Sequence, residues 1–306
     1  MDFPDLHRIK PDSRVRLAQI DPDDTSGFVP KISPHKADTN ANKSKANKSK
    51  ANKSKANTST VDKHAIKQLA SDQVDANIAR VVTLQELLYA ENRLGILVVL
   101  QGMDTSGKDG VIRSVFSGIN PQGCHVKSFK KPSEAEADRD FLWRIHAAIP
   151  ARGEIGVFNR AHYEDVLIVR VHNFVPEAVW RRRYDMINQF EEYLTNNNIV
   201  ILKFMLHISK DEQKERLQAR LDDPSKHWKF NPADVAERKH WDDYQRAYEA
   251  ILEKCSTPHA PWYVIPANKK WYRNWAISTI LRKTMEEVNP KAPKATFDAK
   301  QIVIPD

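Results

Sequence analysis

Residues 97–110, "LVVLQGMDTSGKDG", combine an apolar run with residue types that bind phosphate. Gly102, Gly107 and Lys108 follow the Gly-x4-Gly-Lys spacing of a loop that joins a strand to a helix. Such a loop turns its backbone N–H groups, the N-terminal end of the helix and the lysine toward one anion. The segment therefore predicts a phosphate site, and a plain strand-turn-helix with a surface lysine is the structural alternative.

Two carboxylates stand near the place where this type of loop carries a hydroxyl. The position after Lys108 is Asp109, whereas a Ser or Thr that holds magnesium is usual there. Asp104, inside the loop, can bind Mg²⁺ directly or through water, so that the ion bridges phosphoryl oxygens. Asp109 has two interpretations, a catalytic carboxylate or a charge that complements the helix dipole.

A second polar segment, residues 153–173, follows another apolar run. Its charged and amide side chains are Asn159, Arg160, Glu164, Asp165 and Arg170. In a phosphate-binding α/β protein, this position suits a second magnesium anchor and an arginine that clamps a phosphate. Surface ion pairs between neighbouring turns are the alternative. We expect His162 and His172 to be packing or solvent-facing residues, because no third metal-binding side chain keeps spacing with them.

A third segment, residues 214–234, is rich in basic side chains. Arg216 and Arg220 lie at i and i+4 of a predicted helix, and Lys226 and Lys229 follow in a loop bounded by prolines. These residues could form a lid that closes over a transferring group and excludes water. A solvated helix face is the alternative. A polymeric anion would need a longer basic track, for which the candidates are Lys127, Lys130, Lys131, Arg113, Arg170, Arg181 and Arg182.

The elements that must position these side chains alternate along the chain. Apolar runs at residues 95–101, 124–129, 154–159, 198–209 and 260–267 predict strands, four of them buried on both faces. Between them, helix signals include a capping box at Ser133 and Glu136 before residues 137–149, Pro176 near a helix start, and a second box at Ser209 and Glu212. We therefore predict a doubly wound parallel α/β sheet, in which ligands bind beyond the carboxyl ends of the strands.

The chain divides by composition. Residues 1–60 carry 12 Lys and Arg against 7 Asp and Glu, a net charge of +5, which leaves +3 of the total +8 for the rest. They comprise an arm, of which residues 14–28 are expected to pack on the domain, and a threefold "ANKSK" repeat at Ala41–Lys55 that predicts a disordered basic linker. Residues 61–295 would form the catalytic domain, with a lid at about 209–233, and residues 296–306 a tail.

Several classes of protein are excluded or disfavoured by composition. No apolar run is long enough to span a bilayer, and residues 1–8 lack the form of a secretory signal, so we expect a cytoplasmic protein without a membrane partner. Cys124 and Cys255 have no metal-binding or disulfide spacing and are expected to be ordinary buried or half-buried thiols. The tryptophans are expected to be mostly core residues.

The three polar segments, in this order, resemble the family-2 polyphosphate kinases, and they are most similar to the class III branch, which acts on nucleoside mono- and diphosphates. Residues 260–281, "APWYVIPANKKWYRNWAISTIL", are also similar to that branch, so the resemblance covers about residues 81–290. It implies a thymidylate-kinase-like fold and transfer of the terminal phosphate of inorganic polyphosphate to AMP or ADP, giving ADP or ATP. The linker at Ala41–Lys55 is not part of the resemblance.

The resemblance also implies roles for individual residues. Asp104 resembles the Walker A aspartate that handles Mg²⁺, with Mn²⁺ as an alternative, Lys108 the phosphate-contacting lysine, and Arg160 the Walker B arginine. Asn159 stands where other classes have an aspartate, and Ala161 where a serine is expected. The remaining expected site residues are, for phosphate, Gly102, Ser106, Gly107, Lys127, Lys130, Arg170 and Arg181; for the lid, Arg216, Arg220, Lys226 and Lys229; and for the acceptor nucleotide, Asn159, Glu164 and Asp165. Related proteins are commonly dimers or tetramers, so a homo-oligomer is expected.

Two other functions remain open at the level of sequence. An ATP-dependent nucleotide kinase on the same fold would have a pocket for the adenine of the donor beside the glycine-rich loop, whereas polyphosphate needs an open basic groove there. A non-catalytic polyanion or nucleic-acid binder would depend on residues 41–55. The nearly neutral charge balance outside residues 1–60 argues against the binder, and we expect no specific nucleic acid partner.

Overall fold

The computed structural model describes residues 3–30 and 63–305, and its centre is a five-stranded sheet. The strands are β1 (Gly95–Gln101), β2 (Cys124–Ser128), β3 (Ile155–Asn159), β4 (Ile199–His207) and β5 (Trp262–Pro266), in the order β2-β3-β1-β4-β5. All pairings are parallel. Each of the five predicted apolar segments therefore forms a strand, and β1 lies at the centre, where the strand order reverses.

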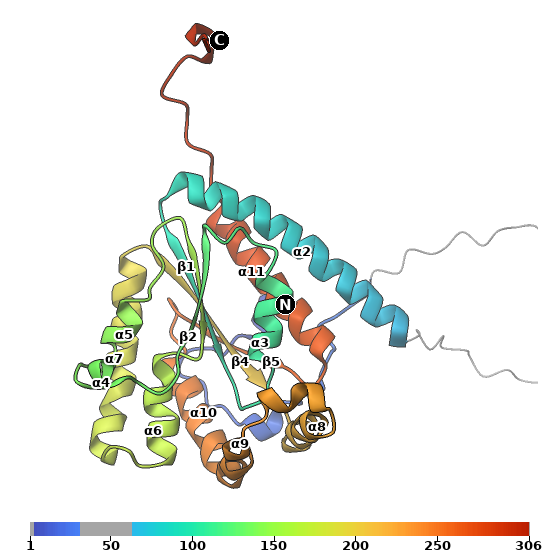
Figure 1. The fold of residues 1–306 in the computed structure, drawn as a ribbon. Helices are drawn as coiled ribbons and strands as arrows, with labels where there is room; N and C mark the ends of the chain where they lie inside the picture. Colours follow the sequence, from blue (N-terminus) through green and yellow to red (C-terminus); the bar gives the residue numbers. More distant parts are fainter. Residues whose placement is uncertain (1–2, 31–62, 306) are drawn as a thin grey trace, which may run out of the picture.

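Helices cover both faces of this sheet (Figure 1). On one face lie the helices α2 (Lys63–Glu91) and α11 (Lys270–Val288), which pack side by side. On the other lie α7 (Glu177–Asn196) and α10 (Trp241–Cys255). The predicted doubly wound α/β architecture is confirmed, and a single long helix, α2, precedes β1.

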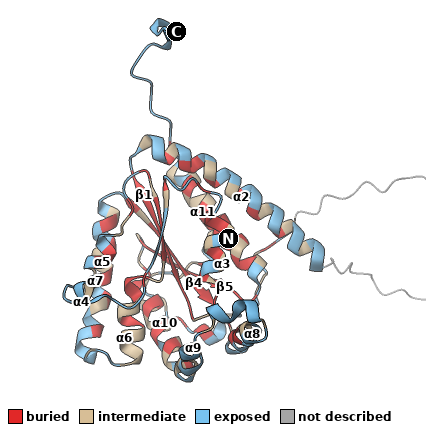
Figure 2. Cartoon of the chain, in the orientation of Figure 1, coloured by how far each residue is buried: buried red, intermediate tan, exposed pale blue. Residues whose placement is uncertain are grey.

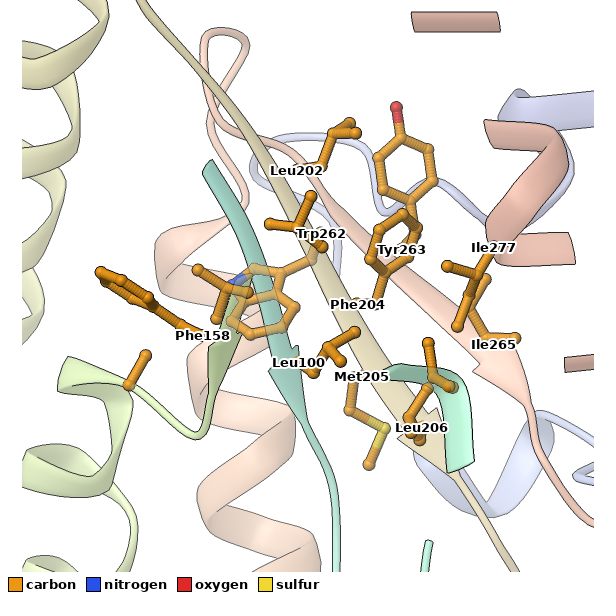
Figure 3. Packing of buried hydrophobic residues seen from close by; sticks show 14 of the residues in the cluster. Leu100, Phe158, Leu202, Phe204, Met205, Leu206, Trp262, Tyr263, Ile265 and Ile277 are labelled. Carbon is orange, nitrogen blue, oxygen red and sulfur yellow. The ribbon is translucent and has the colours of Figure 1, made fainter. Parts of the chain in front are cut away.

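The core lies between the sheet and the two helical layers (Figure 2). Every residue of β1 is buried, and the same holds for β5 and nearly all of β4, as parallel strands covered on both faces require. Phe158, Phe204 and Trp262 fill the space around β1 (Figure 3). β2 is the exception among the five strands, because it is an exposed edge strand.

Short elements carry the polar segments at the carboxyl ends of the strands. After β1 come α3 (Lys108–Val111) and a π-helical turn, η2 (Ile112–Phe116); after β3 come η3 (His162–Val166) and α6 (Ile168–Val171). After β4 come α8 (Lys210–Leu221), η4 (Pro224–Lys229), α9 (Pro232–Glu237) and η5 (Arg238–His240). Ser209 caps α8 by accepting a hydrogen bond from the backbone of Glu212, as predicted. The other half of the predicted box does not form, because the backbone N–H of Ser209 donates to Asn268 and the Glu212 carboxylate accepts from Arg216.

The predicted helix at residues 137–149 is wrong as a continuous element. The capping box of Ser133 and Glu136 is present, but the helix it begins, α4 (Glu134–Ala137), ends after four residues, and α5 (Trp143–His146) follows separately. Between them the side chain of Asp140 accepts a hydrogen bond from the backbone N–H of Leu142. Such local side-chain bonds compete with helical backbone bonding, and this one stands at the break.

The N-terminal residues pack on the domain as expected. They form α1 (Phe3–His7) and a short turn, η1 (Leu17–Gln19), and Val15, Leu17 and Phe28 join the core. The linker repeat at residues 41–55 lies outside the described residues. At the other end, residues 291–305 leave the body of the molecule as an exposed tail with one short turn, η6 (Ala299–Gln301) (Figure 1).

Three further expectations about side chains have clear outcomes. Cys255 is buried and Cys124 half-buried, as predicted for ordinary thiols. Trp143 and Trp228 are exposed, so the expectation that tryptophans fill the core fails for these two, because both lie in short surface elements. Within the described ranges, no helix combines the length and the apolar character that crossing a membrane would require.

Candidate active site

The turn after β1 is formed by residues 102–107, called here the glycine loop. Gly102 and Gly107 have φ of +150° and +101°, a region that side chains rarely adopt. A Cβ atom at Gly102 would lie 2.7 Å from the carbonyl oxygen of Leu206, and one at Gly107 would lie 1.9 Å from Nη1 of Arg273. Both positions need glycine, so the loop can turn directly into α3 and expose its backbone N–H groups.

Lys108 is held beneath this loop. Its Nζ atom donates to the carbonyl oxygens of Gly102, at 2.7 Å, and Met103, at 3.3 Å, and the side chain is buried. Burial, together with the nearby guanidinium of Arg160, lowers the pKa of Lys108 to about 8. The ammonium is therefore poorly solvated, which strengthens its attraction to a phosphate that enters the site.

Two hydroxyls of the glycine loop are buried without a hydrogen-bond partner in the part of the chain that the structure describes. They are Oγ1 of Thr105 and Oγ of Ser106. Leaving such a group unpaired costs about 1–3 kcal/mol. A ligand oxygen in the loop would remove that cost, so the two hydroxyls support the prediction of an anion site that includes Ser106.

The first two predicted segments meet across the end of β1. Nη2 of Arg160 donates to Oδ1 of Asp104 at 2.6 Å, and Nδ2 of Asn159 donates to Oδ1 of Asp109 at 2.7 Å. The sheet register explains this, because Asn159, the last residue of β3, lies opposite Leu100 near the end of β1. Arg160 then takes a left-handed backbone conformation, with φ of 64°, that turns the chain toward the loop.

A cavity of about 900 Å³ opens in front of these residues. Its wall holds ten cationic side chains and three carboxylates, so it suits a polyanion rather than a neutral ligand. The cations are Lys108, Arg113, Lys130, Arg160, Arg216, Arg220, Lys226, Lys229, Lys270 and Arg273, and the carboxylates are Asp104, Asp109 and Asp234. We call it the cationic cavity.

A smaller cavity of about 260 Å³, called here the acidic cavity, adjoins the cationic cavity. Its polar wall includes Asp104, Glu164, Asp234, Glu237, Tyr244 and Tyr248. Burial and the nearby Asp104 raise the pKa of Asp234, and burial with the hydrogen bond to Glu237 raises that of Tyr244. Asp104, Arg160 and Asp234 line both cavities, so the two spaces share one wall.

Arg216, predicted as a lid cation, is fully engaged in holding the glycine loop. Nη1 donates to the carbonyl oxygens of Thr105 and Ser106, at 2.9 and 3.1 Å. Nη2 donates to those of Ala267 and Asn268, at 2.7 and 3.1 Å. The guanidinium therefore connects the loop after β1 to the loop after β5. Arg216 also lines the cationic cavity and contributes positive charge to it.

The other predicted lid residues are more open. Arg220 donates to the carbonyl oxygen of Lys229 at 3.2 Å and lies 3.6 Å from a carboxylate oxygen of Asp234. Trp228 is 78% exposed although it lines the cationic cavity, and Nζ of Lys229 lies 4.7 Å from the centre of its ring. Lys226 lines the same wall. These side chains could move onto a ligand without breaking a buried contact.

Five predicted site residues line neither of the two cavities. One of them is Ser106, although its buried hydroxyl belongs to the glycine loop. Lys127 lies on the exposed edge strand β2. Arg170 and Arg181 both lie against the ring of Trp180, at 4.9 and 5.1 Å from its centre. Asp165 forms an ion pair with Arg183 at 2.9 Å. Of the predicted basic track, Lys130 and Arg113 are the members that the cationic cavity includes, and a role in binding for the others stays a prediction.

Sequence reasoning missed Arg273, Lys270, Asp234 and Gln213. Arg273 is buried, and its Nη1 donates to the carbonyl oxygen of Ser106 at 3.2 Å. Nε2 of Gln213 donates to the carbonyl oxygen of Asp104 at 3.1 Å. Two of the four residues could have been found from their position in the chain. Lys270 and Arg273 lie in the first turn of the helix after β5, at the carboxyl edge of the sheet where the other polar segments lie.

Comparison with known proteins points to one family. The family description "Polyphosphate kinase 2" matches residues 64–293. The AMP/ADP-polyphosphate phosphotransferase of Meiothermus ruber is 47% identical over 298 residues, which cover 97% of this chain and 98% of the relative. The ADP-polyphosphate phosphotransferase of Rhodopseudomonas palustris is 49% identical over 231 residues, 72% of this chain and 80% of the relative.

A solved structure extends the similarity to the fold. The crystal structure of a polyphosphate kinase 2 from Arthrobacter aurescens superposes with a TM-score of 0.84, at 40% identity, over 98% of this chain and 94% of that one. The expected family resemblance is thereby confirmed along nearly the whole chain. By sequence and by fold, this chain belongs to the polyphosphate kinase 2 family of phosphotransferases.

Proposed function

We propose that this protein transfers the terminal phosphoryl group of inorganic polyphosphate to AMP and to ADP, giving ADP and ATP in a reversible reaction. The observation that carries the proposal is the cationic cavity on the glycine loop, with ten cationic side chains against three carboxylates. A chain of phosphates needs charge along its whole length and no base pocket. The names of the relatives from Meiothermus ruber and Rhodopseudomonas palustris support the same donor and acceptors.

The two cavities suggest where donor and acceptor bind. Polyphosphate would lie in the cationic cavity, with its terminal phosphate on the glycine loop beside Lys108. The nucleoside would lie in the acidic cavity, where Glu164 and Glu237 can accept hydrogen bonds from ribose hydroxyls and the adenine amino group. Donor and acceptor phosphates would then meet at Asp104 and Arg160, which both cavities share.

The residues at this meeting point fit a divalent metal, which phosphotransferases generally use, and we propose Mg²⁺, with Mn²⁺ as an alternative. Among the described residues no group of three His, Cys, Asp or Glu is arranged as a metal cage. Mg²⁺ does not need one, because it usually binds one or two carboxylates together with substrate phosphates and water. Asp104 would hold the ion, and the ion would neutralise charge on the phosphoryl oxygens.

The protein groups then act through position and charge. An oxygen of the acceptor phosphate attacks the terminal phosphorus, the bond to the next phosphate of the chain breaks, and polyphosphate leaves one unit shorter. Lys108 and Arg160 stabilise the negative charge that spreads over the transferring group. Arg220, Lys226 and Lys229 would close over it from the lid segment at residues 209–233 and exclude water. No protein nucleophile takes part.

The test is to mix the purified protein with Mg²⁺, long-chain polyphosphate and AMP, with no nucleoside triphosphate present, and to follow ADP and ATP by chromatography. ADP and then ATP should form, and Lys108→Ala should be inactive. If only added ADP is converted, the acceptor range proposed here is wrong. If no product forms until a nucleoside triphosphate is supplied as donor, the protein is an ordinary nucleotide kinase.

Two properties of the working protein belong to the same proposal. We expect the protein to act in the cytoplasm, where its nucleotide acceptors are found, and to form a homo-oligomer of two or four chains. Light scattering on the purified protein tests the second point, since a monomeric mass would contradict it. The basic linker at residues 41–55 is not needed for the reaction, so its deletion should leave turnover nearly normal.

A further inference from the structure

The loop between β5 and α11 connects three parts of the molecule through one buried side chain, Asn268. This residue is 8% exposed and lines neither cavity. Its backbone N–H donates to the carbonyl oxygen of Pro22, and its Nδ2 donates to Oδ2 of Asp23 at 2.8 Å. Both partners belong to residues 3–30, called here the N-terminal arm.

The remaining polar atoms of Asn268 face the active site elements. Its Oδ1 accepts a hydrogen bond from the backbone N–H of Ser209, and its Nδ2 also approaches Oγ of Ser209, at 3.1 and 3.2 Å. Ser209 is the N-cap of α8, the helix that carries Arg216 and Arg220. The carbonyl oxygen of Asn268 accepts from Nη2 of Arg216, whose Nη1 holds the glycine loop.

The N-terminal arm is held to the domain by several contacts near Asn268, so it can fix the position of the loop that contains this residue. Oδ1 of Asp23 forms an ion pair with Nζ of Lys269 at 2.7 Å, and these contacts lower the pKa of Asp23. The carbonyl oxygen of Ile20 is 3.0 Å from Nε2 of His207, the last residue of β4. Phe28 packs edge-on against Trp275 of α11.

We propose that Asn268 is a positioning residue through which the N-terminal arm, by way of Asp23, sets the placement of the lid helix α8 and the glycine loop. The inference rests on the proposed function, because its effect is read as the use of polyphosphate. Lys270, two residues further on, lines the cationic cavity. Loss of the Asn268 contacts should therefore weaken polyphosphate binding without removing any group that touches the substrate.

The expected result for Asn268→Ala is a KM for polyphosphate about 10-fold higher, as the loss of two or three hydrogen bonds implies. The change in kcat should be smaller than the change in KM. Asp12→Asn is the matched control, because Asp12 is an exposed carboxylate of the same arm in a left-handed conformation that Asn adopts easily. It should leave both constants unchanged.

A swap of the two side chains separates positioning from simple loss of stability. Asn268→Asp places two carboxylates against each other and should raise the KM for polyphosphate strongly, whereas Asp23→Asn keeps an acceptor for Asn268 and should raise it little. In the double variant Asp23→Asn with Asn268→Asp, the amide at 23 can donate to the carboxylate at 268. Its KM should return toward that of Asp23→Asn alone.

All variants are assayed at a temperature where thermal melting shows each of them folded. If the wild type turns over polyphosphate and Asn268→Ala changes melting but not the KM for polyphosphate, the inference is overturned. It is also overturned if the double variant is as impaired as Asn268→Asp. If the wild type itself does not use polyphosphate, the proposed function has failed, and that outcome is distinguishable from the other two.

Discussion

Nη2 of Arg160 lies 2.6 Å from Oδ1 of Asp104, and this contact joins the two sequence segments that carry the proposed chemistry. Both side chains are partly exposed, at 39% and 28%, and both line the two cavities that adjoin the glycine loop. A cation and a carboxylate paired at the shared wall are placed to exchange partners when phosphates and a metal arrive. The ion pair holds the two groups in position until then.

Asp104→Asn tests whether this carboxylate serves the reaction rather than the fold. It should lower kcat about 1,000-fold, because the charge that would hold the metal on the transferring phosphate is lost. The free energy of unfolding should change by less than about 1 kcal/mol, because the ion pair is partly solvated. Steady-state kinetics over a range of Mg²⁺ concentrations and a thermal melt measure the two effects. A variant that melts early but keeps its kcat would assign Asp104 to the fold.

Arg216 and Arg220 lie one turn apart on α8 but should differ in what they contribute. Arg216→Ala leaves several carbonyl oxygens of the loops after β1 and β5 unpaired, so it should lower the free energy of unfolding by about 3 kcal/mol. Arg220→Ala breaks one long hydrogen bond and a partly exposed ion pair with Asp234, so it should change stability by less than about 1 kcal/mol while raising the KM for polyphosphate about 10-fold. Denaturant unfolding and kinetics on both variants check the contrast. Equal behaviour of the two variants would contradict it.

Lys108 predicts a pH dependence for the capture of polyphosphate. Its pKa in the free protein is lowered to about 8, so the amine is charged below that pH and loses its proton as pH rises through it. The value of kcat/KM for polyphosphate reports the free protein and should therefore fall above about pH 8. In Lys108→Arg the side chain stays charged, so the alkaline decline should disappear even if activity is low. A decline that persists in this variant would assign it to another group.

Trp228 offers a direct view of the lid segment. It is 78% exposed and lines the cationic cavity, so closure over bound polyphosphate and AMP should shield it from acrylamide quenching. The chain has 7 tryptophans, and the difference between the wild type and Trp228→Phe isolates this one. Trp143→Phe is the matched control, because Trp143 is exposed at 43% and lines neither cavity. Shielding that is the same for Trp228 and Trp143 would rule out a local closure.

The fold could be predicted from the sequence because buried strands and helix ends have recognisable local sequence patterns. The runs that became β1 and β5 are continuous apolar segments, and Ser209 and Pro176 stand at the starts of α8 and α7 as predicted. The break between α4 and α5 could not be predicted from apolar spacing. At this break the side chain of Asp140 accepts a hydrogen bond from the backbone N–H of Leu142, a contact that depends on a polar side chain and not on apolar spacing.

The site followed from the sequence only in part, for a related reason. Asp104, Lys108 and Arg160 stand in spacings that carry chemistry, and the structure brings them to one wall. Arg273 lies 165 residues after Lys108, and Asp234 lies 74 residues after Arg160. Both reach that wall only through the order of the strands in the sheet. No local pattern marks them, so the sheet topology was needed to find them.

The measurement that tests the central claim most directly is a comparison of phosphoryl donors with AMP as the acceptor. Initial rates of ADP formation are measured with polyphosphate and, separately, with ATP, each over a range of donor concentrations at fixed Mg²⁺. The cationic cavity predicts that kcat/KM for polyphosphate exceeds that for ATP by about 100-fold or more, since each added phosphate contact contributes. A ratio near one, or a preference for ATP, would contradict the assignment of polyphosphate as the donor.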